Sequence, residues 1–329
     1  MYGNVVEVTR VDQHRRALPW IALGVVYVLW GSTYLANRFI IVSMPPLLAS
    51  GFRFMTGGLL LGLLVLVFAG PRAFAMTRAQ LGTAALSGLL LPAWGNGLVI
   101  LAQSQVASGL TALLIASVPL YIAVLRALTG DRPRRATVLG VLVGAAGLAL
   151  LVLVGPSGGS GGVSGSAWWG PPLVLLAGAG WATGTFAATR LAVPANPFAL
   201  ATVQQLIGGA ILVVVGTTFG ERLHPADIAP VSWWAWLYMS LFVSLGAFSA
   251  YAYALATLPV STVATYAYVN PVIAVLLGVV VAGERFSVLQ LAGGAIVLVA
   301  VVMVIAAERP ARQRPTVRDP ARPTPRAAG

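Results

Sequence analysis

The chain contains no cysteine and no lysine, and charged residues make up only 9% of its 329 positions. The absence of cysteine excludes disulfide frameworks, thiolate metal sites and cysteine nucleophiles. The low charge excludes a soluble protein with a polar surface around a buried core, because 58% of the residues are hydrophobic. The sequence therefore predicts an integral membrane protein.

Acidic side chains are scarce, and none lies within a long apolar segment. The eight carboxylates occur in loops, in the tails or at the ends of apolar segments: Glu7, Asp12, Asp131, Glu221, Asp227, Glu284, Glu308 and Asp319. Both histidines, His14 and His224, also lie outside the apolar segments. Membrane proteins that move protons or cations usually do so through ionisable groups inside their spans. We therefore expect no buried carboxylate, no metal site, no cofactor and no catalytic residues.

Ten apolar segments of about twenty residues, the length that crosses a bilayer, account for most of the chain. Their approximate ranges are 19–39, 47–69, 79–101, 109–128, 136–154, 168–189, 197–219, 232–256, 260–282 and 289–306. An even number of spans places both termini on one side of the membrane. The other side holds only Arg38, Arg53, Arg222 and Arg285, which leaves sixteen of the twenty arginines on the side of the termini. The positive-inside rule therefore predicts that both termini are cytoplasmic.

Composition divides the chain into five parts. We expect a cytoplasmic N-terminal segment (1–17), a first five-helix repeat (18–155), a Gly/Ser linker (156–167), a second five-helix repeat (168–307) and a disordered cytoplasmic tail (308–329). The tail is rich in Pro and Arg but has no aromatic residues to stack on bases, so the net charge of +12 does not indicate nucleic acid. Attraction to anionic lipid headgroups is the expected consequence.

The two halves of the chain align with an offset of 151 to 153 residues. Matching positions include Thr33 with Thr185, Arg38 with Arg190, Pro46 with Pro197, Gly57 with Gly208, Pro119 with Pro271, and Gly130-Asp131-Arg132 with Gly283-Glu284-Arg285. Each half holds an odd number of spans, so the second half must enter the membrane from the opposite face. The sequence therefore predicts an all-α membrane protein of ten transmembrane helices in two inverted five-helix repeats, an arrangement typical of secondary transporters.

Aromatic and polar side chains in the middle of the spans are the candidate substrate-binding residues. They are Trp30, Tyr34, Trp94, Asn96, Ser117, Trp181, Tyr251, Tyr266 and Asn270. Such groups bind an amphipathic solute by ring stacking and amide hydrogen bonds. Ordinary helix packing is an equally good interpretation for each aromatic residue. The tryptophans at positions 168, 169, 233, 234 and 236 lie at span ends, where an interfacial aromatic belt explains them.

Pro119 and Pro271 are predicted hinges, because a proline inside a span removes a backbone hydrogen bond and the two are related by the repeat. In the second copy, Thr262, Tyr266 and Asn270 follow one another at helical spacing before the proline. The first copy has apolar residues at these positions. We therefore expect the span at 260–282 to be specialised for recognition.

Arg53 is the charged residue closest to the interior of a span. One interpretation makes it a gate or an anchor for an anionic group. The other, which we favour from sequence, has its side chain snorkel to the external interface with help from a carbonyl or Glu284. Its repeat counterpart, Gln204, is neutral, so the symmetry of the fold does not require the charge.

Four runs of sequence together resemble the EamA-type transporters of the drug/metabolite transporter superfamily: WGSTYLANR, PPLLASGFRF, SGLTALLIASVPL and NPVIAVLLGVVVAGERF. The resemblance covers about residues 18–306. It implies a basket-like fold of ten helices with a central cavity, residence in the bacterial inner membrane, and movement of small metabolites, often amino acids or related compounds, usually outward. It does not fix the substrate.

The leading hypothesis is therefore a secondary transporter that exports a small amphipathic metabolite by alternating access. A membrane-embedded enzyme such as a lipid-modifying transferase remains an alternative, although Asp131, Asp227 and Glu284 form no recognisable catalytic motif. A non-transporting sensor or assembly protein is a third class, suggested only by the basic tail. The expected partners are the substrate and the lipid bilayer. The oligomeric state stays open, and a monomer is compatible with the sequence.

Overall fold

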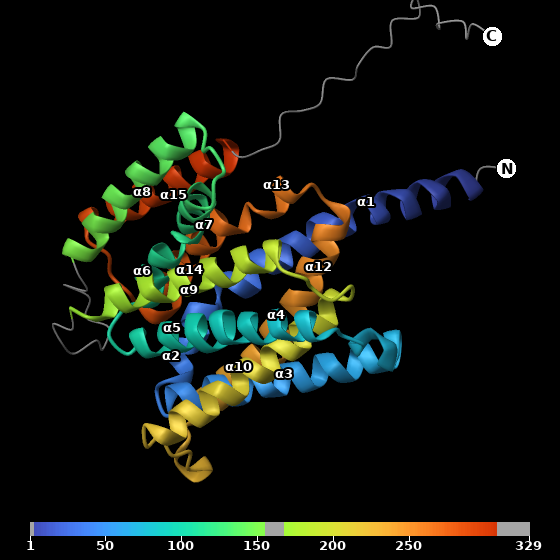
Figure 1. Ribbon diagram of the computed structural model, residues 1–329, viewed down its shortest axis with the longest axis horizontal. Coiled ribbons are helices and arrows are strands. Elements are labelled where there is room, and N and C mark those ends of the chain that lie inside the picture. The colour runs from blue at the N-terminus through green and yellow to red at the C-terminus, as the bar shows by residue number, and fades with distance from the viewer. Residues whose placement is uncertain (1–2, 155–167, 308–329) are drawn as a thin grey trace, which may run out of the picture.

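The computed structural model describes residues 3–154 and 168–307, and every element in these ranges is helical (Figure 1). The linker predicted at 156–167 and the tail predicted at 308–329 lie outside the described residues. The prediction of an all-α membrane protein is confirmed for the described ranges.

The first half of the chain forms five predicted spans and one short connecting helix. Its elements are α1 (Gly3–Gly31), α2 (Thr33–Ile40), α3 (Pro46–Ala69), η1 (Pro71–Phe74), α4 (Arg78–Gly88), η2 (Leu89–Asn96), α5 (Gly97–Ala102), α6 (Ser108–Ile115), α7 (Val118–Leu128) and α8 (Arg135–Val154). Helix α1 begins at Gly3, so the first helix extends well into the N-terminal segment expected at 1–17.

The second half follows the same order. Its elements are α9 (Gly170–Arg190), α10 (Pro197–Thr218), η3 (Pro225–Asp227), α11 (Pro230–Tyr238), η4 (Met239–Ala247), α12 (Phe248–Thr257), α13 (Val260–Val263), α14 (Tyr266–Ala282) and α15 (Val288–Ala307). Within the described ranges, nine helical segments are long and apolar enough to cross a membrane. The tenth predicted span, 260–282, is divided into α13 and the shorter apolar helix α14.

Both predicted hinge prolines follow a break in their span, but at different distances. Between α6 and α7 the break lies at residues 116–117, two residues before Pro119, which has no N–H to donate to the preceding turn. Between α13 and α14 the break lies at residues 264–265, and Pro271 sits inside α14. The second break is therefore six residues before its proline, and the two breaks are not at aligned positions.

Two π-helical turns, which sequence patterns did not predict, interrupt the third and eighth spans. They are η2 and η4, and their first residues, Leu89 and Met239, are 150 positions apart. This spacing is close to the offset that aligns the two halves. A π-helical turn widens the helix and is frequently found at functional sites. Both halves therefore carry the same local distortion.

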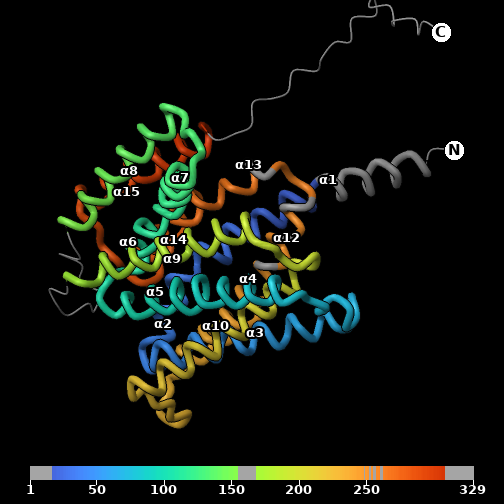
Figure 2. The backbone as a smooth tube through the Cα atoms, in the orientation of Figure 1, coloured from blue at the N-terminus to red at the C-terminus, as the bar shows by residue number. Residues whose placement is uncertain are grey.

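Two tight helix pairs join the halves of the chain. Helix α3 packs along α10, and α8 packs along α15, as Figure 2 shows from their traces. Glycines permit the close approach of α3 and α10: a Cβ added at Gly209 would lie 2.8 Å from the carbonyl oxygen of Gly51 and 2.9 Å from the amide nitrogen of Met55. Each pair thus forms a rigid contact between the two halves.

Gly209→Ala is expected to lower the melting temperature of the purified protein, because the added methyl group would overlap backbone atoms of α3. Overpacking of this kind costs about 1–3 kcal/mol. Gly82→Ala is the matched control, since a Cβ at Gly82 on α4 meets no atom within 4 Å. Thermal unfolding in detergent measures both variants. An unchanged melting temperature for Gly209→Ala would contradict the close packing of α3 against α10.

Candidate functional site

Three of the predicted substrate-binding residues form an aromatic cluster, which we define as Trp30, Tyr251 and Tyr266. The ring centroid of Trp30 lies 5.0 Å from that of Tyr251 and 5.0 Å from that of Tyr266, and the two tyrosine rings are 5.7 Å apart. Helices α1, α12 and α14 each supply one member. Edge-to-face and tilted rings of this kind offer both π faces and hydroxyl groups to a ligand.

Asn270 lies one helical turn beyond Tyr266 on α14. Its side chain is buried, and its Oδ1 has no hydrogen-bond partner among the described residues. A buried acceptor without a partner costs free energy unless a ligand or water satisfies it. Tyr266 and Asn270 thus both belong to α14, and the recognition role of this helix stays a prediction. Thr262 belongs to the separate helix α13, so the predicted polar stripe is not continuous.

Tyr34 lies on α2, between the aromatic cluster and the end of the molecule predicted to be external. Its backbone carbonyl accepts a hydrogen bond of 2.7 Å from Gln103 Nε2, and Asn37 Nδ2 donates to Gln103 Oε1 at 3.0 Å. Gln103 follows α5, so this amide pair ties α2 to the third span. Neither Gln103 nor Asn37 was among the candidates from sequence.

Trp94, Asn96 and Trp181 lie at another interface, between η2 and α9. Trp94 Nε1 donates to the carbonyl of Leu176 at 3.0 Å, and a Cβ added at Gly95 would lie 2.8 Å from the Trp181 ring. The side chain of Asn96 donates within its own turn. In the described ranges, no ring contact joins Trp94 or Trp181 to the aromatic cluster. In this conformation these contacts are those of helix packing.

Ser117 is fully buried at the break between α6 and α7, where its hydroxyl donates to the carbonyl of Leu114 at 2.6 Å. The backbone amide of Ser117 donates to the same carbonyl at 3.2 Å, so both groups of Ser117 bond to the last turn of α6. Leu114 is fully buried in a hydrophobic core built from spans four, five, six and ten. This face of span four is a packing face, in contrast to the polar counterpart on α14.

Arg53 does not reach the external interface, so the snorkelling expected from sequence is wrong. Its side chain is 3% exposed and points to η4, where Nη1 lies 3.8 Å from Met239 Sδ. The guanidinium carbon also lies 4.0 Å from the centroid of the Phe54 ring. The rotation of α3 about its axis is set by its packing against α10, and this rotation directs Arg53 inward. Glu284 does not assist it, because another arginine occupies that carboxylate.

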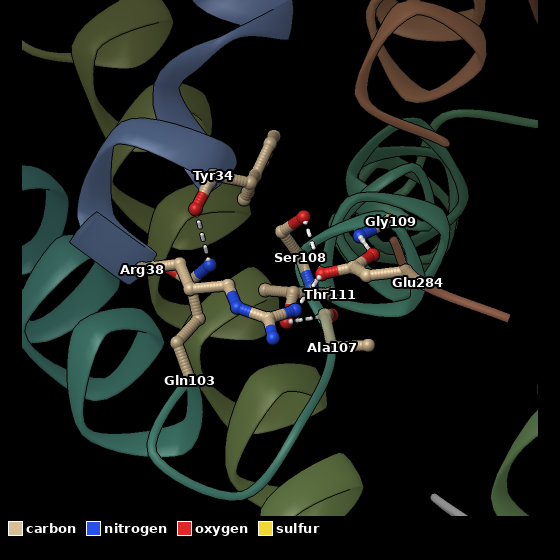
Figure 3. Close-up of polar contacts among 8 residues, drawn as sticks. All are labelled: Tyr34, Arg38, Gln103, Ala107, Ser108, Gly109, Thr111 and Glu284. Carbon is tan, nitrogen blue, oxygen red and sulfur yellow. Dashed lines mark hydrogen bonds and ion pairs between the residues drawn. The ribbon is translucent and has the colours of Figure 1, made fainter. Parts of the chain in front are cut away.

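Glu284 corrects the expectation that no carboxylate is buried. Its side chain is 2% exposed, and Oε1 accepts from Arg38 Nη1 at 2.7 Å. Oε1 also accepts from the amide and hydroxyl of Ser108 at 2.7 and 2.8 Å, and Oε2 accepts from the Gly109 amide at 3.1 Å. Figure 3 shows Arg38 and Glu284 pointing toward one another beside the start of α6. Gly283, with a φ of 64°, ends α14 and turns the chain so that Glu284 faces inward.

The aligned residues at the opposite end form a looser ion pair. Asp131 Oδ2 lies 3.4 Å from Arg190 Nη2 and accepts from Arg126 Nε at 2.9 Å. The side chains of Asp131 and Arg190 are 41% and 49% exposed. The repeat alignment matches Arg190 with Arg38 and Asp131 with Glu284. It gave no indication that the arginine and the carboxylate at each end are in contact.

Glu221 caps a second helix at the end predicted to be external. Its carboxylate accepts from the backbone amides of Leu47 and Leu48 at 3.1 and 2.8 Å, at the start of α3. A carboxylate at a helix N-terminus satisfies amides that have no partner within the helix. Within the described part of the chain, no group of three or more His, Cys, Asp or Glu residues could hold a metal ion.

Comparisons with known proteins agree with this architecture. The model of the EamA-like transporter family matches residues 18–153 and 168–306. The inner membrane transporter YedA of Escherichia coli K12 is 36% identical over 292 residues, which cover 88% of this chain and 92% of YedA. A WAT1-related chloroplastic protein of Arabidopsis thaliana is 28% identical over 87% of this chain and 69% of its own.

The fold also matches a solved structure. A crystal structure with a TM-score of 0.59 and 20% sequence identity covers 89% of this chain and 99% of its own. At this level of identity the match supports the fold alone. The family model covers most of both halves, and the helices are those of a multi-pass membrane protein. The chain belongs to the EamA-like transporter family.

Proposed function

We propose that this protein is a secondary transporter of the inner membrane, with both termini in the cytoplasm. It exports a small amphipathic metabolite, an amino acid or a related compound, by alternating access between two inverted repeats. Family membership supports transport as the activity. The observation that carries the mechanism is a pair of ion pairs, Arg38–Glu284 and Arg190–Asp131, which occupy matched positions in the two halves.

Each ion pair joins one half of the chain to the other. Arg38 ends the first span and Glu284 follows the ninth, whereas Arg190 ends the sixth span and Asp131 follows the fourth. The repeat alignment converts one pair into the other. If the halves are inverted in the membrane, the two pairs lie at opposite ends of the transport pathway. We call them the external latch (Arg38–Glu284) and the internal latch (Arg190–Asp131).

The two latches differ in the way that alternating access requires. The external latch is short, and its carboxylate is shielded from solvent and bonded to the start of α6. The internal latch is longer and about half exposed. Exposed ion pairs contribute only about 0–1 kcal/mol, whereas charge-assisted hydrogen bonds out of water are stronger. We infer that the external latch holds this conformation closed at the external end. The internal latch is too weak to hold the internal end closed.

The alignment also indicates what the opposite conformation would contain. Gly109, whose amide binds Glu284, aligns with Ser261 at the start of α13 by the offset that matches Pro119 with Pro271. In the opposite state Asp131 would therefore bind the amides at the start of α13, and Glu284 would separate from α6. The break between α13 and α14 gives this short helix freedom to move.

The aromatic cluster is the proposed recognition element. Its rings can stack on an apolar or aromatic group of the substrate, and the unpartnered Oδ1 of Asn270 can accept a hydrogen bond from an amine or amide. The other predicted residues, Tyr34, Trp94, Asn96, Ser117 and Trp181, are proposed to line the pathway as the spans rock.

Purified protein in proteoliposomes should move at least one compound from a panel of radiolabelled amino acids, purines and aromatic amines. Asn270→Ala and Trp181→Ala should each lower the flux about fivefold or more, because each removes a proposed substrate contact worth about 1 kcal/mol. Trp234→Ala is the matched control, since that side chain is exposed at a span end. Deletion of residues 309–329 should leave the flux intact. Absence of protein-dependent flux across the panel would contradict the transport proposal.

Glu284→Gln should open the external end. The chain has no cysteine, so a single reporter can be introduced at Thr111, a fully buried residue on α6, or at Ala264, in the break between α13 and α14. Loss of the charge on Glu284 weakens its bonds to Arg38 and α6 and should raise labelling of Thr111→Cys by a membrane-impermeant maleimide about tenfold. Labelling at Ala264→Cys from the internal side should fall.

Asp131→Asn is the matched control, because its ion pair is loose and exposed in this conformation. It should leave the labelling of Thr111→Cys low. Equal labelling in the Glu284→Gln and Asp131→Asn backgrounds would contradict the assignment of the closed end.

A further inference from the structure

We propose that Arg53 and Gln205 form an anion subsite that binds the carboxylate of the transported molecule. This inference rests on the proposed function and narrows its substrate class to molecules that carry a carboxylate on an apolar or aromatic body. The subsite lies where α3, α10 and η4 meet. It uses the one charged side chain that the sequence places well inside a span.

Arg53 is a buried cation without a counter-ion. In the described ranges, no carboxylate lies within ion-pair distance of its guanidinium, and its Nε has no hydrogen-bond partner. Its contacts are the thioether of Met239, a weak acceptor, and the ring of Phe54. A buried charge that lacks a partner costs several kcal/mol. A ligand anion would supply the acceptors that the guanidinium lacks.

Gln205 brings a second set of unpartnered polar atoms to the same interface. Its side chain is buried, and neither Nε2 nor Oε1 has a partner among the described residues. A Cβ added at Gly57 would lie 2.8 Å from Gln205 Oε1 and 2.6 Å from Ser244 Cβ, so Gly57 makes room for the amide. Gly57 is one helical turn from Arg53, so the two positions lie roughly 6 Å apart on the same face of α3.

Arg53 and Gly57 on α3 face successive turns of η4. Arg53 contacts Met239 on η4, and Gly57 faces Ser244 one turn further along the same element. Gln205 approaches from α10. A guanidinium and an amide N–H are donors, and a carboxylate accepts from both, most strongly from arginine. The chemistry of the subsite therefore selects an anion over an amine.

One hydrophobic cluster connects the subsite with Trp30. Met239, which contacts Arg53, belongs to a buried hydrophobic cluster against which Trp30 packs. A ligand with an aromatic or aliphatic body at Trp30 and a carboxylate at Arg53 would satisfy both. The second half of the chain has the neutral Gln204 at the aligned position, so the charge is not a requirement of the shared fold.

Binding to purified protein in detergent tests the subsite directly. The probes are phenylacetate, phenylacetamide and phenethylamine, which share a ring but are anionic, neutral and cationic. Isothermal titration should show that the wild-type protein binds phenylacetate about tenfold or more tightly than phenylacetamide, since loss of a charged partner costs at least 1.4 kcal/mol. Phenethylamine should bind more weakly than either.

Arg53→Met should abolish the preference for phenylacetate over phenylacetamide, and Arg53→Lys should retain part of it. Arg222→Met is the matched control, because Arg222 is exposed beyond α10, and it should bind as the wild type does. A wild-type protein without the preference, or a folded Arg53→Met variant that keeps it, would overturn the proposal.

Gln205→Glu gives a test that does not depend on removing Arg53. The new carboxylate would pair with the guanidinium, so this variant should have a raised melting temperature and should no longer bind phenylacetate. Retained phenylacetate binding in Gln205→Glu would overturn the proposal even if Arg53→Met failed to fold.

The subsite and the transport proposal fail separately. Suppose that the protein moves compounds in proteoliposomes without any preference for carboxylates, and that its Arg53 variants bind phenylacetate as the wild type does. This result overturns the subsite and leaves the transport proposal in place. Binding of phenylacetate that depends on Arg53 supports the subsite even if no compound is moved.

Discussion

The carboxylate of Glu284 makes the hydrogen bonds on which the relative positions of spans one, four and nine depend. It accepts four hydrogen bonds, from Arg38 at the end of α2 and from Ser108 and Gly109 at the start of α6. A carboxylate this well bonded tolerates burial, and removal of its cationic partner would leave an uncompensated charge. Because the bonded groups belong to three different spans, one side chain sets the position of all three at one end of the molecule.

The rest of the molecule separates into rigid and movable contacts. The pairs α3–α10 and α8–α15 interlock through glycines, and such packing has few alternative arrangements. The fourth and ninth spans, which precede the latch carboxylates Asp131 and Glu284, contain breaks instead, at residues 116–117 and 264–265. The π-helical turns η2 and η4 distort the third and eighth spans at nearly aligned positions. This division suits a protein in which two halves rock about fixed contacts.

Symmetry and asymmetry of the two halves have different consequences. In the proposed transport cycle, the latches depend on what the halves share, because the opposite state would reuse the same contacts at the other end. The proposed recognition depends on what the halves do not share. Tyr266 aligns with Leu114, which is fully buried in a packed core, and Arg53 aligns with the neutral Gln204. Tyr266 belongs to the aromatic cluster, and Arg53 is buried without a counter-ion among the described residues.

The sequence by itself determined the membrane class, the positions of most spans, the family and the residues matched between the halves, because hydropathy and repeat spacing are properties of the chain. It also named the members of the aromatic cluster. Only the tertiary structure decided that Arg53 points inward, that Glu284 is buried and that Trp94 and Trp181 pack at a separate interface. Hydropathy averages over all sides of a helix, so the direction of each side chain is set by the rotation of its helix against its neighbours.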